Sequence, residues 1–304
     1  MKLNMNRRRF LGALSVGTAH VLFSNPIYAA VSQLTSADPL QRVKLGKSGL
    51  ETTLIGFGTG VNATNRSAAL TRQNHKESLD TLRYAYDRGL RMYDTADAYG
   101  THQLVAEAMK NMDRDKITLV SKMWVQRGGI PEFERPDADV VIDRFRKELN
   151  TDYIDLVQIH LMTAANWTDQ WKKQMDILDN LKSKGIIKAH GVSVHSLDAM
   201  KAAAESPWVD VVHVRINPYG IAMDKPEPEE VVDVIHKLHA AGKGVIGMKL
   251  IGAGRYGSDN EKIDNALKFV TGLGSVDMMV VGFEHKTQID NYLGRVEKIL
   301  SARG

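Results

Sequence analysis

The sequence of 304 residues contains no cysteine. Disulfide bonds, thiolate metal sites, a cysteine nucleophile and a lipid-modified cysteine are therefore all excluded. His236 and His239 share a helix face, but no third ligand accompanies them, so we expect no metal site. The chain also lacks a run of roughly 20 strongly apolar residues, which is what a helix needs to span a bilayer. We therefore expect no stable membrane span.

Acidic residues are missing from the first 37 residues, which carry Lys2, Arg7, Arg8 and Arg9. These four cations equal the formal net charge of +4, so the rest of the chain is nearly neutral. A near-neutral body without a stripe of Lys or Arg argues against a nucleic-acid partner.

The segment NRRRFLGALSVGTAHVLFSNPIYAA has the order of an export signal, with a basic start, a moderately apolar stretch broken at Pro26, and alanines at its end. Its Arg7-Arg8 pair resembles a bacterial twin-arginine signal, which exports proteins that are already folded. A disordered basic tail and an organelle transit peptide are the alternatives.

This reading divides the chain into three parts. We expect a signal peptide over residues 1–30, a linker over residues 31–42 and a catalytic domain over residues 43–304. The twin-arginine export machinery would then be a partner of the precursor, and the protein would be periplasmic or secreted.

Short apolar runs alternate with helical patterns from Leu54 onward. Most runs are too continuously apolar for a strand with one face in water. They end near Phe57, Asp94, Lys122, His160, Val194, Ile216, Met248 and Phe283. Eight strand–helix repeats over about 250 residues predict a (β/α)8 TIM barrel of the α/β class. A doubly wound sheet is the alternative, but no Gly-rich dinucleotide turn follows the first strand.

Turn and capping residues agree with the predicted strands and helices. The stretch VKLGKSGLETT, residues 43–53, predicts a short N-terminal β-hairpin before the barrel. Helix ends are expected at glycines and helix starts at aspartates that flank the periodic segments, namely Gly89, Gly185, Gly242, Asp137 and Asp198.

Polar residues close three of the predicted strands, at Asp94, Lys122 and His160, and Tyr99 follows five residues after Asp94. In a TIM barrel these strand ends converge on one site. A tyrosine has an ordinary pKa of about 10, and we expect a neighbouring Lys122 ammonium, held by Asp94, to lower it. His160 would aim a carbonyl oxygen at the phenol. A positioned acid contributes only roughly 10²–10⁴ in rate, so a cofactor is expected for the hard step.

From about Leu40 to its C terminus, the chain resembles an aldo-keto reductase. The segments that carry the resemblance are LGKSGLETTLIGFGTG, DTADAYG, LVSK, YIDLVQIH, GVSVHS, INPYG and VVGFEHKTQIDNYL. The resemblance implies that Asp94, Tyr99, Lys122 and His160 form a catalytic tetrad, with Tyr99 as the general acid in carbonyl reduction. It also implies a nicotinamide cofactor laid across the barrel mouth without a Rossmann unit.

The resemblance further implies where the nicotinamide would bind. Members commonly have Ser-Asn after the fifth strand, a Gln on the sixth and an aromatic residue at the end of the seventh. This chain has Ser193-Val194, His213 and Met248 at those positions, so the amide contacts and the stacking differ. Methionine can still pack on an aromatic face.

The adenosine end is expected near residues 282–288 and Asn291 or Tyr292. Members that prefer NADP often carry Lys and Arg there, whereas this chain has Gly282 and Gln288, so Lys249, Arg255 or Lys286 would have to supply the charge. NADP is the cofactor that the resemblance favours, and NAD is the alternative. The implied cofactor-binding residues are Gly58, Thr59, Asp94, Ser193, His213, Met248, Lys249, Arg255, Gly282, Phe283, Gln288 and Asn291.

Trp124 and Trp167 follow the third and fourth strands, and we expect them to wall the substrate pocket, although a core position would explain either one. Aromatic walls suit a small, moderately apolar carbonyl compound. Two other functions stay open: a non-catalytic barrel that senses a cofactor or binds a partner, and a lyase that uses Lys122 as a Schiff base. The complete tetrad favours the reductase.

Overall fold

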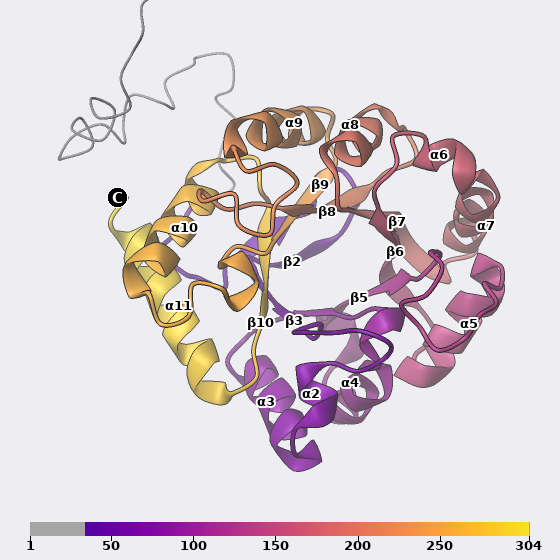
Figure 1. Cartoon of the computed structure of the whole chain (residues 1–304). Helices are drawn as coiled ribbons and strands as arrows, with labels where there is room; N and C mark the ends of the chain where they lie inside the picture. Colours follow the sequence, from indigo (N-terminus) through magenta and orange to yellow (C-terminus); the bar gives the residue numbers. More distant parts are fainter. Residues whose placement is uncertain (1–33, 304) are drawn as a thin grey trace, which may run out of the picture.

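Eight parallel strands close into a barrel in the order β10-β3-β4-β5-β6-β7-β8-β9. The computed structural model describes residues 34–303, so the predicted signal peptide lies outside the described residues. The barrel strands are β3 (Ile55–Gly58), β4 (Met92–Asp94), β5 (Thr118–Met123), β6 (Ile154–Met162), β7 (Ile187–Val194), β8 (Val211–Arg215), β9 (Gly244–Met248) and β10 (Met278–Gly282). Figure 1 looks along the barrel axis, with the strands at the centre and the helices around them. The predicted TIM barrel is confirmed.

Helices cover the outer face of the barrel, which explains why the strands are continuously apolar. They are α2 (Ala69–Arg72), α3 (His75–Asp87), α4 (His102–Met109), α5 (Ala138–Leu149), α6 (Trp167–Gln170), α7 (Lys172–Ser183), α8 (Leu197–Glu205), α9 (Pro228–Ala240), α10 (Asn260–Gly272) and α11 (Lys286–Ser301). Short 3-10 helices are η2 (Asp97–Tyr99), η3 (Arg114–Lys116) and η4 (Gly252–Gly254). In residues 34–303 we find no helix with the length and apolarity that crossing a membrane requires.

Most of the predicted helix boundaries are correct. Glycines at positions 89, 185 and 242 follow the ends of α3, α7 and α9, and Asp137 is the N-cap of α5. The predicted start at Asp198 is wrong, because Ser196 caps α8. Its hydroxyl oxygen accepts a hydrogen bond from the Ala199 amide at 3.0 Å, which satisfies a backbone donor of the first turn.

The predicted N-terminal hairpin is present as β1 (Arg42–Lys44) paired antiparallel with β2 (Glu51–Thr53). It packs at the amino ends of the barrel strands, because Gly46 pairs with Lys243, the residue before β9, and the Lys47 amide donates to the Gly242 carbonyl at 2.8 Å. The hairpin therefore occupies one end of the barrel and leaves the carboxyl ends of the strands for the site.

Candidate active site

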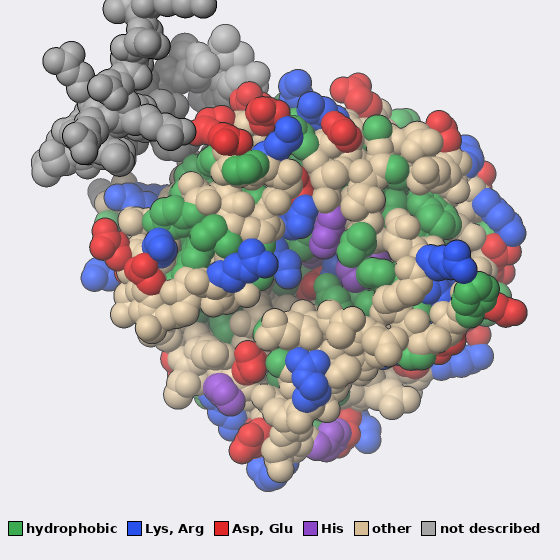
Figure 2. All heavy atoms as spheres, in the orientation of Figure 1, with side chains coloured by type: hydrophobic (Ala, Val, Ile, Leu, Met, Phe, Trp, Pro, Cys, Tyr) green, Lys and Arg blue, Asp and Glu red, His purple; other side chains and the backbone are tan. Residues whose placement is uncertain are grey.

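The carboxyl ends of the strands surround a hollow. Figure 2 looks into it and shows hydrophobic, basic and histidine side chains on its walls. Loops that follow the barrel strands form its rim, as in other barrels of this type.

A buried ion pair lies at the base of this hollow. Lys122 of β5 is 1% exposed, and its Nζ donates to Oδ1 of Asp94 at the end of β4 and to the Thr95 carbonyl oxygen at 3.0 Å. Burial alone would raise the pKa of the Asp94 carboxyl, but Lys122 and His213 outweigh it and lower that pKa. Burial also lowers the pKa of the Lys122 ammonium, against the opposing effect of Asp94.

Tyr99 ends the 3-10 helix η2 and is half-buried in the hollow. The Lys122 Nζ lies 5.2 Å from the centroid of its ring, and the His160 ring lies edge-on at a centroid distance of 5.7 Å. The structure therefore brings together all four residues that the sequence predicted for the tetrad.

The prediction that Lys122 lowers the pKa of Tyr99 is wrong. Burial raises the pKa of the Tyr99 phenol above its ordinary value, and the Asp94 carboxylate raises it further. The Lys122 ammonium is bound to Asp94 and to a carbonyl oxygen, so its charge is already matched. Tyr99 is consequently a neutral phenol at physiological pH, which is the form that a proton donor needs.

His160 is a neutral imidazole, because burial and then the charge of Lys122 hold its pKa well below the usual value. It lies next to an irregularity in β6, where the strand register shifts between Ile159 and Met162 and Leu161 adopts a positive φ of 63°. The Leu161 amide donates to the Ser193 hydroxyl oxygen at 2.9 Å. A bulge of this kind re-aims side chains at barrel rims, and here it lies beside His160.

Four of the predicted cofactor-binding residues contact the tetrad or lie beside it. The Thr59 hydroxyl donates to the Asp94 carbonyl oxygen at 2.9 Å, and Gly58 is the strand partner of Asp94. His213 is fully buried, with its Nε2 3.2 Å from Asp94 Oδ1. Ser193 has the role at the β6 bulge described above.

Basic residues lie at the mouth near β8 and β9. Met248 and Lys249 are half-buried, and Lys249 follows the end of β9 with a positive φ of 60°. Burial lowers the pKa of the Lys249 ammonium, and the charges of Arg215 and Lys122 lower it further. Arg215 pairs with the buried Asp224, whereas within residues 34–303 neither Lys249 nor Arg255 has an ion pair.

The residues predicted for the adenosine end have internal partners. The Gln288 side-chain oxygen accepts from the Glu284 and His285 amides at 2.7 and 3.0 Å, and so caps α11. Asn291 Oδ1 accepts from Arg295 Nε at 2.7 Å. Phe283 is a core residue at 1% exposure, whereas Gly282 is exposed at the end of β10.

The two tryptophans predicted for the pocket wall have different positions. Trp124 is half-buried, and its ring lies edge-on to His160 at a centroid distance of 5.1 Å. Trp167 is fully buried at the start of α6, and its Nε1 donates to the Ala199 carbonyl of α8 at 3.2 Å. The prediction that Trp167 walls the pocket is therefore wrong, because its ring fills the helical layer.

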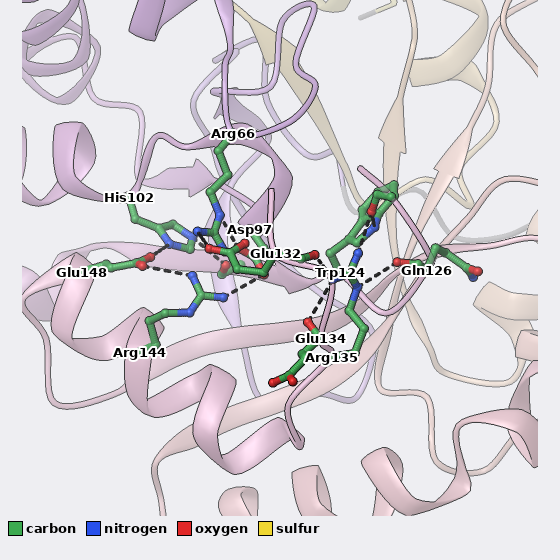
Figure 3. A network of polar contacts seen from close by, with 12 residues as sticks. Arg66, Asp97, His102, Trp124, Gln126, Glu132, Glu134, Arg135, Arg144 and Glu148 are labelled. Carbon is green, nitrogen blue, oxygen red and sulfur yellow. Dashed lines mark hydrogen bonds and ion pairs between the residues drawn. The ribbon is translucent and has the colours of Figure 1, made fainter. Parts of the chain in front are cut away.

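Sequence reasoning missed a network of charged residues beside Tyr99, shown in Figure 3. Its centre is Asp97, whose carboxylate is bound by Arg66 and Arg144. The one signal in the sequence is an acidic residue two positions before Tyr99.

Over residues 34–303 the structure has no group of three metal-ligating side chains.

The model of the aldo/keto reductase family matches residues 54–294. The "Probable aldo-keto reductase 1" of Glycine max is 25% identical over 240 residues, which are 75% of this chain and 66% of that protein. An NADH-specific methylglyoxal reductase of Escherichia coli is 24% identical over 202 residues, 60% of this chain and 58% of that protein. The chain thus spans less than two thirds of the length of either relative.

A solved structure has the same fold. It is the holo form of an aldo-keto reductase from Bacillus halodurans, with a TM-score of 0.68 and 18% sequence identity. The match covers 86% of this chain and 96% of that chain.

Proposed function

Because the chain belongs to the aldo/keto reductase family of NAD(P)H-dependent oxidoreductases, we propose that it reduces an aldehyde or ketone to the corresponding alcohol. The observation that carries this proposal is the convergence of Tyr99, Lys122, Asp94 and His160 at the base of the hollow.

Each residue has a role that its environment permits. Tyr99 keeps its proton and donates it to the carbonyl oxygen, while the neutral His160 orients that oxygen. Asp94 holds Lys122 beside the Tyr99 ring, and the one Nζ proton that neither Asp94 nor the Thr95 carbonyl accepts can bind the phenol oxygen as its proton leaves. The same Tyr99 accepts the proton when an alcohol is oxidised.

The mouth fits a nicotinamide nucleotide. Within residues 34–303, Nδ1 of His160 and Nδ1 of His213 are buried without a hydrogen-bond partner, and the half-buried Lys249 has no ion pair. The carboxamide of the nucleotide can hydrogen-bond to a histidine nitrogen, and its phosphate groups can pair with Lys249. When bound, it supplies the hydride.

We further propose that the nucleotide is NADPH. Lys249 and Arg255 provide unpaired positive charge on the loop after β9, whereas Gly282 and Gln288 provide none. Because one relative, from Escherichia coli, is NADH-specific, the affinities for NADPH and NADH have to be compared directly. Nucleotide titrations of the wild type and of Lys249→Met and Arg255→Met would show which cation discriminates the 2′-phosphate.

The direct test is a panel of aldehydes and ketones, methylglyoxal included, with NADPH and NADH, followed by the loss of reduced-nicotinamide absorbance. Turnover of one carbonyl class supports the reductase. Binding of both nucleotides without turnover of any carbonyl would instead favour a cofactor-sensing barrel. Borohydride trapping of a ketone on Lys122 would favour a lyase.

We also propose that the precursor crosses the bacterial inner membrane folded, through the twin-arginine machinery. The support is the Arg7-Arg8 pair and the absence of acidic residues from the first 37 positions.

A further inference from the structure

A buried carboxylate lies on the turn that carries Tyr99. Asp97 begins η2, is 3% exposed and is bound by two arginines. Its Oδ1 accepts from Nε and pairs with Nη2 of Arg66 at 3.0 and 2.8 Å, and its Oδ2 accepts from Arg144 Nη2 at 2.8 Å. A buried carboxylate needs such partners, and a two-pronged arginine contact also fixes its orientation.

The Arg144 arm of this network joins the Tyr99 turn to the barrel strand β5. Arg144 Nη1 donates to Glu148 Oε1 at 3.0 Å, and Glu148 Oε2 lies 2.7 Å from His102 Nδ1. His102 Nε2 is in turn 2.9 Å from the hydroxyl oxygen of Ser121. This arm connects elements of the barrel wall, so it holds the turn from behind.

The Arg66 arm leads to the mouth instead. Arg66 Nη1 donates to Glu132 Oε1 at 2.5 Å, in the loop of residues 124–137 that follows β5. The backbone amide of Arg66 donates to the Ala98 carbonyl at 2.9 Å, and the Asn65 amide donates to the Gly129 carbonyl at 3.1 Å. Arg66 therefore lies between the Tyr99 turn and this loop, and contacts both (Figure 3).

The loop is wrapped around Trp124. The indole Nε1 donates to the Gly128 carbonyl, and a Cβ at position 129 would lie 2.1 Å from the indole ring, so only glycine fits there. Arg135 binds the loop from within, by donating to several of its carbonyl oxygens, that of Gly128 included. These bonds tie the Trp124 ring to the loop, and the same ring lies edge-on to His160 at a centroid distance of 5.1 Å.

We propose that Arg66 is a specificity-determining residue, which positions the Trp124 wall relative to Tyr99 without contacting the reacting atoms. The inference rests on the proposed carbonyl reduction. Asp97 keeps Arg144 when the Arg66 side chain is removed, so the Tyr99 turn stays in place, while the loop loses its side-chain attachment at Glu132 and keeps only the backbone bond from Asn65. Large substrates that use the Trp124 wall then bind less well, whereas small ones that do not reach it are unaffected.

The test compares Arg66→Ala and Arg66→Lys with the wild type on a three-carbon aldehyde and on an aromatic aldehyde. For Arg66→Ala we expect the KM for the aromatic aldehyde to rise about tenfold, the equivalent of one lost charge-assisted hydrogen bond, with kcat on the small aldehyde within about twofold. Arg66→Lys keeps the charge but not the planar fork, and we expect an intermediate KM.

Iodide quenching of tryptophan fluorescence supplies a readout that does not depend on turnover. Quenching should increase in Arg66→Ala, and this increase should vanish when Trp124→Phe is added. Arg42→Ala is the matched control, because it breaks a half-exposed ion pair, Arg42 Nε to Glu51 Oε1 at 3.1 Å, in the hairpin at the opposite end of the barrel.

Equal losses of kcat on both aldehydes, with unchanged quenching, would overturn the proposal and make Arg66 a support of Tyr99 alone. Unchanged kinetics and quenching would overturn it as well. If Arg66→Ala does not fold, Arg66→Lys and Glu132→Gln carry the same test. Should the wild type turn over no aldehyde, the proposed function fails, whereas the quenching experiment still decides whether Arg66 holds the loop.

Discussion

Tyr99 keeps its proton because it lies half-buried beside the Asp94 carboxylate, and both burial and that charge raise its pKa. We predict that Tyr99→Phe lowers kcat for carbonyl reduction by roughly 10²- to 10⁴-fold, the usual contribution of a positioned acid. Nucleotide affinity should stay near normal, since the phenol oxygen transfers a proton and does not hold the nucleotide. Steady-state kinetics and a fluorescence titration measure the two effects. Turnover within a few-fold of the wild type would refute the assignment.

The four residues of the tetrad could be predicted because each one is a polar exception at, or just after, the end of an apolar strand. Their electrostatics could not. The order of residues shows that Lys122 is near Tyr99, but not that its charge is matched by Asp94. The buried position of Trp167 could not be predicted either. The sequence suggests a loop after the fourth strand, but it does not reveal that helix α6 begins at Trp167.

The β1–β2 hairpin packs against the residues before β9, away from the site, so we expect its contribution to stability to be separable from activity. Gly46 and Gly49 both have positive φ, 52° and 80°, but only at Gly46 would a Cβ meet backbone, 2.4 Å from the carbonyl carbon of Lys243. We predict that Gly46→Ala lowers the free energy of unfolding by about 2 kcal/mol more than Gly49→Ala, because a clash is added to the same φ strain. Activity per folded molecule should be unchanged in both.

Urea denaturation of the two alanine variants checks this prediction, with kinetics under native conditions beside it. Equal losses of stability in the two variants would mean that a Cβ at position 46 does not clash with the backbone before β9. A loss of activity in folded Gly46→Ala would mean that the hairpin end of the barrel affects the site.

Strands and hairpin were predictable because burial on both faces and tight turns leave local patterns in the sequence. The bulge at Leu161 and the contacts of Arg66 leave none. Leu161 depends on the Ser193 hydroxyl of the next strand, and Arg66 depends on Asp97 and Glu132, which are 31 and 66 residues away. Contacts between distant loops follow from the closed barrel and have no periodicity of their own.

The stability of the whole molecule should fall as the pH drops below neutrality. Burial, with Arg215 and Lys249, lowers the pKa of His195 to about 3, against about 6.5 in an unfolded chain. Between these values the unfolded state binds a proton that the folded state excludes, so the free energy of unfolding decreases as pH falls. Between pH 7 and pH 5 the free energy of unfolding should therefore fall less for His195→Asn than for the wild type. We predict a difference of about 1 kcal/mol, which includes a discount for the partial exposure of His195.

Urea midpoints of both proteins at the two pH values measure this difference. His190 and His213 are present in both proteins and cancel in the comparison, whereas the effect of His195 on the pKa of His160 is part of the measured difference. Equal losses of stability would show that His195 titrates normally in the folded protein.

The proposed export concerns the full chain, with its Arg7-Arg8 pair. Arg7→Lys with Arg8→Lys keeps the charge of the leader but removes the paired guanidinium groups, which ammonium groups do not replace in recognition. We predict that this variant stays in the cytoplasm as a folded, active, uncleaved precursor. Cell fractionation with activity assays checks it, and efficient periplasmic recovery of the double-lysine variant would show a route independent of twin-arginine recognition.

Transfer of a hydride from a nicotinamide to a carbonyl carbon is the event on which the proposed function depends. It is measured by supplying NADPH deuterated at the transferable position of C4, together with an aldehyde or ketone that is turned over, and by mass spectrometry of the alcohol. We predict one deuterium on the carbinol carbon with the wild type, and almost no labelled alcohol with Tyr99→Phe at equal nucleotide occupancy. An alcohol without deuterium, or equal labelled product from Tyr99→Phe, would contradict hydride transfer assisted by Tyr99.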